Sequence, residues 1–203
     1  MSTTEKRPAH RPSRRGVIVE TAFELFATGP VDAVTVADIA AAAGMTSAAI
    51  YYHYPSREEI LLEGLREFSS AYVGEIRRIT TEESIPDGSL GSLVPSLARW
   101  LEDNRTRAVV YFVHARGSSQ LVEALRRDNT ADLIPILSGT ARKVRGKLSA
   151  AEAGVIAVAL IAQIEVFASS LLSKDSVFDT LGRKKYVETA ARLSDRIAGT
   201  ANV

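Results

Sequence analysis

The chain of 203 residues contains no cysteine. Disulfide bonds, thiolate metal sites and cysteine nucleophiles are therefore excluded, and a cytoplasmic location is expected. The three histidines, His10, His53 and His114, are too scattered for the usual spacing of a metal site. We expect no metal and no other cofactor.

Long hydrophobic runs are also missing. The longest, from Ala153 to Ile164, is shorter than the roughly 20 residues that cross a bilayer. The polar, basic N-terminus has no apolar segment behind its charges, which a secretory signal requires. We therefore expect no membrane span.

Catalytic motifs are absent as well. The sequence contains no HExxH, GxSxG or GxGxxG. Six residues separate Gly139 from Gly146, whereas a phosphate-binding P-loop needs four. Adjacent glutamates at 58–59 and 82–83 lie in polar stretches and do not form a facing acid and base pair. We expect that the protein is not an enzyme.

Net charge is small, at +1, but it is unevenly distributed. Residues 1–16 carry a net charge of +4, whereas residues 17–56 contain no lysine or arginine and carry −4. We expect residues 1–13 to form a disordered basic arm. Such an arm serves either as a solubilising tail or as an extension that binds DNA, where arginines gain from the negative potential of the minor groove.

Apolar residues recur at helical spacing from residue 17 onward, and no segment alternates as a strand would. This predicts an all-α protein of about nine helices, drawn from ten candidate helical segments. Thr35, Thr46 and Ser149 are expected to cap helices, and Gly44 and Pro55 to end them. The expected helices lie at about 13–28, 35–44, 47–54, 56–79, 90–103, 106–116, 119–127, 130–147, 149–173 and 177–198.

The first three helices have the layout of a helix-turn-helix DNA-binding domain, predicted over residues 14–58. On a helical wheel of the third, Ile50 and Tyr54 share one face, and Ala48 and Tyr52 lie opposite. The small residues at its N-terminal end would fit a major groove. Residues 59–203 are expected to form a larger helical domain for ligand binding and dimerisation.

Three segments resemble the TetR family of bacterial transcriptional regulators: Thr35-Val-Ala-Asp-Ile-Ala40, Ala43-Gly-Met-Thr46 and Ile50-Tyr-Tyr-His-Tyr-Pro-Ser-Arg-Glu-Glu-Ile-Leu61. The resemblance covers about residues 14–62. It implies that Ile50 and Tyr54 are core residues. The family more often has phenylalanine at the latter position, so the Tyr54 hydroxyl needs a partner or solvent.

The same resemblance implies which residues contact DNA. Ser47, Ala48 and Ala49 would meet base edges, helped by the hydroxyl of Thr46. Phosphates and sugars would be contacted by Tyr51, Tyr52, His53, Thr35 and Arg57, and the arm would add Arg14 and Arg15.

The expected third helix, residues 47–54, would be the recognition helix that enters the major groove. It contains no lysine, arginine, asparagine or glutamine, so it cannot make bidentate contacts to guanine or adenine. Discrimination between bases should therefore be modest in each half-site. Methyl contacts to thymine, hydroxyl contacts and DNA shape would have to supply it.

The helix at 149–173 is apolar nearly all round, so it is expected to be buried on more than one face. In the resembled family the last two helices pair across a two-fold axis, which implies a homodimer. Gln163 and Glu165 interrupt its apolar stripes. Buried polar groups need partners. These could be the backbone or a neighbouring arginine, a group across the dimer axis, or an effector.

An effector is expected between the C-terminal helices and to be largely apolar. The aromatic and polar residues that would line its cavity are also compatible with plain core packing. They are Phe68, Tyr72, Trp100, Tyr111, Phe112, His114, Gln163 and Phe167.

The resulting hypothesis is a dimeric, ligand-responsive transcriptional repressor that binds a palindromic operator in double-stranded DNA. One alternative is a helical enzyme or a carrier of lipids or small molecules that uses the same cavity. Another is a structural adaptor dimer, which would leave the basic arm without a partner. Salt-dependent binding to duplex DNA separates the first hypothesis from the other two.

Overall fold

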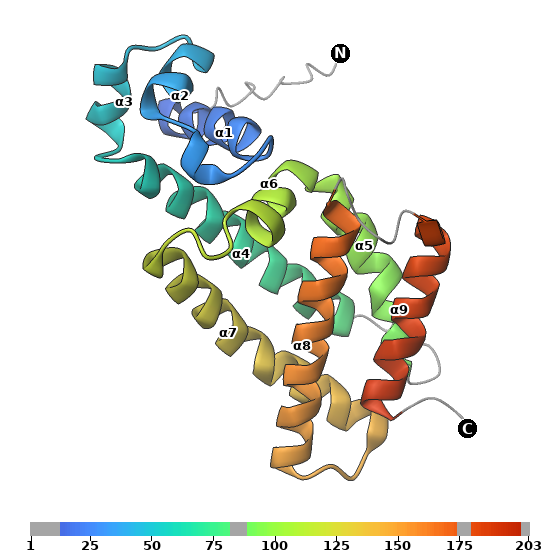
Figure 1. The fold of residues 1–203 in the computed structure, drawn as a ribbon. Coiled ribbons are helices and arrows are strands. Elements are labelled where there is room, and N and C mark those ends of the chain that lie inside the picture. The colour runs from blue at the N-terminus through green and yellow to red at the C-terminus, as the bar shows by residue number, and fades with distance from the viewer. Residues whose placement is uncertain (1–12, 82–88, 174–179, 200–203) are drawn as a thin grey trace, which may run out of the picture.

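A computed structural model describes residues 13–81, 89–173 and 180–199, and every regular element in these ranges is helical. Figure 1 shows three short N-terminal helices at one end of the long helix α4 (Arg57–Thr81), with the remaining helices arranged around the rest of it. The all-α fold and the two-part layout predicted from the sequence are confirmed. The predicted boundary at residues 58 and 59 falls inside α4, so this helix belongs to both parts.

The N-terminal helices are α1 (Arg14–Phe26), α2 (Val36–Ala42) and α3 (Ser47–His53). Side-chain caps define their starts, as predicted for the second and third. Thr35 and Asp38 form a reciprocal capping box at α2, and Thr46 accepts a hydrogen bond from the backbone of Ala49 at α3. Ser13 caps α1 in the same way, so only residues 1–12 of the predicted arm lie outside the described residues.

The core of this domain is formed by apolar side chains from all three helices, and α4 covers it. Gly64 of α4 lies directly against Phe23 of α1, because a Cβ atom at position 64 would come within 2.2 Å of the phenyl ring. This close approach fixes the domain on the first half of α4. The fully buried core side chains include Ile18, Phe23, Phe26, Ile39 and Ile50.

The C-terminal domain contains α5 (Leu93–Asp103), α6 (Arg105–Val109), α7 (Gln120–Arg145), α8 (Ala150–Leu172) and α9 (Arg183–Ala198). In Figure 1, α7 and α8 pair along their length, and α9 lies beside α5 and α8. The chain reverses between α7 and α8 at Gly146, whose φ of 75° suits glycine. The predicted capping box of Ser149 and Glu152 starts α8.

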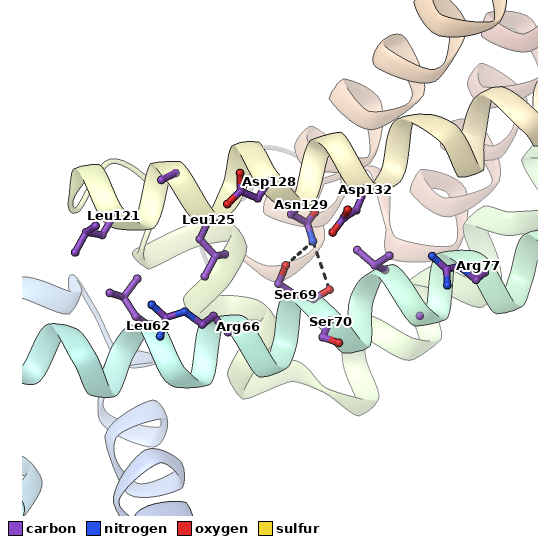
Figure 2. Close-up of a pocket in the computed structure, with 13 residues that line it drawn as sticks. Leu62, Arg66, Ser69, Ser70, Arg77, Leu121, Leu125, Asp128, Asn129 and Asp132 are labelled. Carbon is purple, nitrogen blue, oxygen red and sulfur yellow. Dashed lines mark hydrogen bonds between the residues drawn. The ribbon is translucent and has the colours of Figure 1, made fainter. Parts of the chain in front are cut away.

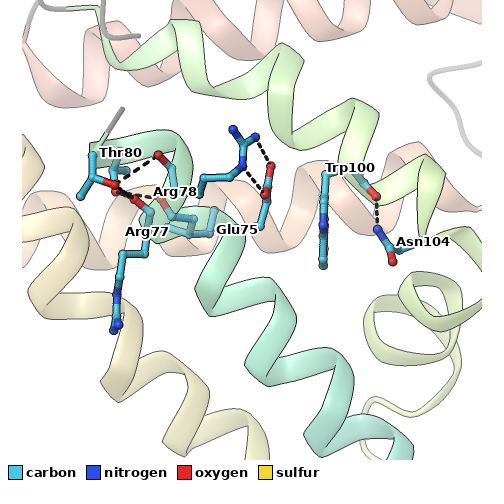
Figure 3. Close-up of polar contacts among 8 residues, drawn as sticks. Glu75, Arg77, Arg78, Thr80, Trp100 and Asn104 are labelled. Atoms are coloured by element: carbon cyan, nitrogen blue, oxygen red, sulfur yellow. Dashed lines mark hydrogen bonds and ion pairs between the residues drawn. The ribbon is translucent and has the colours of Figure 1, made fainter. Parts of the chain in front are cut away.

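Polar side chains of α4 and α5 find local partners (Figure 3). The carboxylate of Glu75 accepts hydrogen bonds of 2.8 and 2.7 Å from Arg78. Thr80 donates to the carbonyl of Ile76, at 2.7 Å. Asn104 ends α5 by donating to the carbonyl of Trp100, at 2.9 Å. These bonds pair the side-chain oxygens of Glu75 and Thr80, which are both buried.

Two expected divisions between helices are wrong. The segments 119–127 and 130–147 form one helix, α7, in which the polar residues near the expected break have hydrogen-bond partners. Asn129 bonds to Ser69 of α4, and Thr130 donates to the carbonyl of Arg126. The segment 106–116 is also divided, since α6 ends at Val109 and a π-helical turn, Val110–His114, follows.

The last helix was expected from residue 177 and begins at Arg183 instead. Part of the expected segment, residues 174–179, lies outside the described residues.

Among the described residues, α8 is the one helix long and apolar enough to cross a membrane. The expectation of no span rested on the run from Ala153 to Ile164, and the helix as a whole is longer, with 23 residues. A third of its most apolar window is buried within the protein, where it packs against α7 and α9. Its other apolar side chains reach the surface.

Candidate nucleic-acid interface

Helix α3 has one buried and one exposed face, as the helical wheel predicts. Ile50 is fully buried and Tyr54 is 2% exposed, whereas Tyr52 is 85% exposed and Tyr51 is 55% exposed. Ala48 is exposed next to Tyr52, and Ser47 and Ala49 are half-buried at its flanks. The side chains predicted to contact DNA therefore lie on the solvent face of one short helix.

The other predicted contacts surround this face. Thr35 and Thr46 are exposed at the N-terminal ends of α2 and α3, where backbone amides also point outward. Arg14 is exposed at the start of α1. The ring of His53 is half-buried and packs edge-on against Tyr52, with ring centroids 5.1 Å apart.

Arg15 instead holds the end of α3 in place. Its guanidinium donates to the carbonyl of His53 at 3.0 Å, pairs with Glu63 of α4 and lies 4.2 Å from the centre of the Tyr54 ring. The Tyr54 hydroxyl donates to the same Glu63 carboxylate at 2.6 Å. Glu63 is thus the partner that this hydroxyl needs, and the sequence analysis missed it.

Arg57 has a similar role at the turn between α1 and α2. Its guanidinium donates to the carbonyls of Val31, Asp32 and Val34, at 2.9 to 3.2 Å, and to the Asp32 carboxylate at 3.0 Å. The predicted phosphate contact of Arg57 stays a prediction. In the structure its donors stabilise a turn of its own domain.

Burial raises the pKa of Glu63, but hydrogen bonds from Arg15 and Tyr54 outweigh burial and lower it below its ordinary value. We expect Tyr54→Phe to lower the free energy of unfolding at pH 7 by about 1 to 2 kcal/mol, the net worth of a hydrogen bond to a partly exposed carboxylate. Chemical denaturation of both proteins measures this difference.

The same difference should depend on pH with a defined sign. Because the pKa of Glu63 is depressed in the folded state, its stabilisation is present above the ordinary pKa and is lost as pH falls through the folded value. The gap between wild type and Tyr54→Phe should therefore close in acid. Tyr51→Phe, at an exposed position, should match the wild type throughout, and an equal loss in both variants would contradict the assignment.

A third arginine, Arg107, joins the two domains. Arg107 of α6 pairs with Glu20 of α1 and, at 2.9 Å, with Glu67 of α4. It also donates to the carbonyl of Gly64 and lies 5.2 Å from the centre of the Phe23 ring. Arg107 therefore connects α6 directly to α1 and α4.

The residues predicted to bind an effector lie in three separate places. Five of them form one aromatic cluster in the C-terminal domain, whose neighbouring ring centroids are 4.8 to 6.3 Å apart. We call it the aromatic cluster: Phe68, Tyr72, Trp100, Tyr111 and Phe112.

The other three predicted effector residues lie outside this cluster. His114 lines a pocket of about 490 Å³ beside α1, α6 and the end of α8. Gln163 and Phe167 line a groove of about 670 Å³ on the surface of α8 and α9. Gln163 donates to the carbonyl of Ala190 at 2.7 Å and accepts from Ser194 at 3.0 Å, so it has the structural partners that were one of its predicted alternatives.

Comparison with known proteins agrees with this geometry. The family model described as bacterial regulatory proteins, tetR family, matches residues 18–63. Over 114 residues the chain is 31% identical to the HTH-type transcriptional repressor KstR2 of Mycolicibacterium smegmatis. The aligned segment covers 56% of each protein. Over 99 residues it is 34% identical to KstR2 of Mycobacterium tuberculosis, covering 49% of the chain and 50% of that protein. The chain thus spans about half the length of these curated relatives.

Solved structures share the fold over nearly the whole chain. The fatty acid degradation regulator FadR from Bacillus halodurans has a TM-score of 0.70 at 17% identity, covering 97% of both chains. FadR from Bacillus subtilis in complex with stearoyl-CoA has a TM-score of 0.70 at 15% identity, covering 92% of this chain and 98% of that one. Identities this low establish the fold alone.

Proposed function

We propose that this chain, whose N-terminal domain belongs to the TetR family of bacterial regulatory proteins, is a transcriptional repressor that leaves its operator when a small molecule binds its C-terminal domain. The observation that carries the proposal is the exposed face of α3. Tyr52 is 85% exposed directly opposite the fully buried Ile50, inside the segment that matches the family. A DNA-binding role would place the protein in the cytoplasm.

The contacts to DNA follow from this face. Ser47, Ala48 and Ala49 would meet base edges, with Tyr51 and Tyr52 on the backbone. The hydroxyl of Thr46 would add a contact to a base, and the remaining contacts to the DNA backbone would come from Arg14, Thr35, His53 and, through residues 1–12, the basic arm. Arg15 and Arg57 stay in the proposed set, although their guanidiniums also bond to their own domain.

The proposed repressor is a homodimer through α8 and α9. Val155, Val158 and Val166 of α8 are 53 to 70% exposed, and Leu193 of α9 is 48% exposed. Together with the groove at Gln163 and Phe167 they form an apolar surface of the kind that a second copy covers. A two-fold dimer implies a palindromic operator whose half-sites lie one helical turn or a multiple of it apart.

The direct test is selection of bound duplexes from a random pool, followed by binding measurements on the selected sequence. We expect a palindrome, and affinity that falls steeply with salt, because cationic groups displace counterions from both half-sites. Removal of residues 1–12, which leaves the Ser13 cap intact, should weaken binding to every duplex and reduce the slope of log affinity against log salt concentration.

The matched control is Tyr52→Ala in the full-length chain. This variant should lose affinity while it keeps the salt slope set by the arm, because a tyrosine carries no charge. If the truncated and intact proteins bound both selected and random duplexes equally at every salt concentration, the arm would be only a solubilising tail. If no duplex were enriched at all, the proposal of a DNA-binding regulator would be wrong.

A further inference from the structure

A buried arginine ties three helical segments together inside the C-terminal domain. Arg126 of α7 is 9% exposed and pairs with Glu165 of α8. It also donates to the carbonyl of Tyr111 at 2.7 Å. That carbonyl is available because the amide of Ala115 bonds to Val110, five residues back, in the π-helical turn. Both terminal nitrogens of Arg126 are thus occupied by protein acceptors.

Tyr72 of α4 lies next to this pair with its hydroxyl unused. The residue is fully buried, and among the described residues its Oη is the only buried side-chain polar atom without a hydrogen-bond partner. Burial, and then the nearby carboxylate of Glu165, hold the pKa of Tyr72 well above its ordinary value. The hydroxyl therefore keeps its proton, and a buried donor without an acceptor is costly.

Four aromatic rings lie near the ring of Tyr72, and one of them, Tyr111 at 6.2 Å, carries a hydroxyl of its own. The ring centroid of Tyr72 lies 5.5 Å from that of Phe112, 6.2 Å from that of Trp100 and 6.3 Å from that of Phe68. Figure 3 shows Trp100 on α5 beside α4. A molecule that reached the Tyr72 hydroxyl would therefore be surrounded by aromatic carbon.

An open groove of about 700 Å³ lies between α4 and α7, the two helices that carry Tyr72 and Arg126 (Figure 2). Asn129 is 3% exposed and is the most buried of the polar residues that line the groove, and it donates to Ser69 Oγ at 2.6 Å. Ser69 lies one helical turn before Tyr72, and Asn129 lies one turn after Arg126. The groove and the buried cluster thus occupy neighbouring turns of the same two helices.

The charges decide which polar group would be accepted. An anionic ligand would meet the carboxylate of Glu165, which already balances the charge of Arg126. A cationic ligand would meet Arg126. An uncharged oxygen acceptor, in contrast, would take the unused proton of Tyr72 and disturb neither partner of the ion pair.

We propose that the Tyr72 hydroxyl is the recognition donor for an uncharged, largely apolar ligand with a carbonyl oxygen, which enters by the groove between α4 and α7. The body of the ligand packs against Phe68, Trp100 and Phe112, so these rings shift when it binds. The role of this ligand as the effector rests on the function proposed above. The existence of its binding site does not depend on that function.

Three matched probes test the inference: 4-tert-butylcyclohexanone, tert-butylcyclohexane and 4-tert-butylcyclohexanecarboxylate. Each is titrated into the full-length protein while the fluorescence of Trp100, the only tryptophan, is followed. We expect the ketone to bind about tenfold more tightly than the hydrocarbon, the ratio that one hydrogen bond supplies. The carboxylate should bind more weakly than the ketone.

The decisive variant is Tyr72→Phe. It should bind ketone and hydrocarbon equally, and its melting temperature should equal or exceed that of the wild type, because it removes an unpaired buried hydroxyl. Tyr186→Phe, the same change on α9 outside the aromatic cluster, should keep the tenfold preference. A ketone that binds no better than the hydrocarbon, a preference that survives in Tyr72→Phe, or tighter binding of the carboxylate would overturn the inference.

Binding of the selected duplex, measured in the same samples, separates this inference from the proposed function. Ketone preference that depends on Tyr72, in a protein that binds no duplex, would support the site and refute the repressor. Duplex binding without any ketone binding would support the repressor and refute the site.

Discussion

Glu165→Ala is expected to lower the free energy of unfolding by about 3 to 5 kcal/mol, because it leaves the buried charge of Arg126 without its partner. The side chains of the pair are only 10% and 17% exposed, so water replaces the lost carboxylate poorly. Arg126 also donates a hydrogen bond to the carbonyl of Tyr111. A shift of Arg126 in the variant would therefore also disturb the π-helical turn. Urea denaturation of the variant and the wild type gives the difference.

The control removes both charges together. Arg126→Met with Glu165→Met replaces the pair by apolar side chains of similar length, and most of the stability lost in Glu165→Ala should return. If Glu165→Ala cost less than about 1 kcal/mol, the pair would behave like an exposed surface ion pair, and its role as an internal tie would be wrong.

The N-terminal domain could be predicted closely because local rules determine it. Caps at Thr35 and Thr46 need only neighbours three residues away, and both are present in the structure. The opposed faces of Ile50 and Tyr52 follow from helical geometry alone. The family resemblance over residues 14–62 added the functional meaning of the exposed face.

Contacts between distant segments could not be predicted. Arg15 lies 48 residues from Glu63, and Arg107 lies 87 residues from Glu20, so only the packing of helices brings them together. The sequence suggested that Arg15 and Arg57 contact DNA. It could not show the bonds by which both side chains also stabilise their own domain.

The candidate effector residues show the same limit. Aromatic residues at helical spacing identify an interior, and five of the eight do form one cluster. Periodicity could not show that Gln163 and Phe167 lie on a different surface, or that Tyr72 keeps an unused hydroxyl. For Glu165, a neighbouring arginine was one of the predicted partners, and the structure identifies it as Arg126.

Substitutions on the two faces of α3 should fail in different ways. Ile50→Ala empties a fully buried position in the N-terminal core and should lower the free energy of unfolding by about 2 to 5 kcal/mol. Any loss of DNA binding in this variant should follow from unfolding of the domain. Tyr52→Ala removes an 85% exposed side chain, so its stability should stay within about 0.5 kcal/mol of the wild type.

Binding to the selected duplex completes the comparison. Tyr52→Ala should bind more weakly at temperatures where it is fully folded, because a backbone contact is lost. Ile50→Ala should recover binding on cooling to conditions where its N-terminal domain is folded. Should Tyr52→Ala unfold the domain while Ile50→Ala stays folded but fails to bind, the two faces of α3 would be reversed, and the proposed DNA contacts would have to be abandoned.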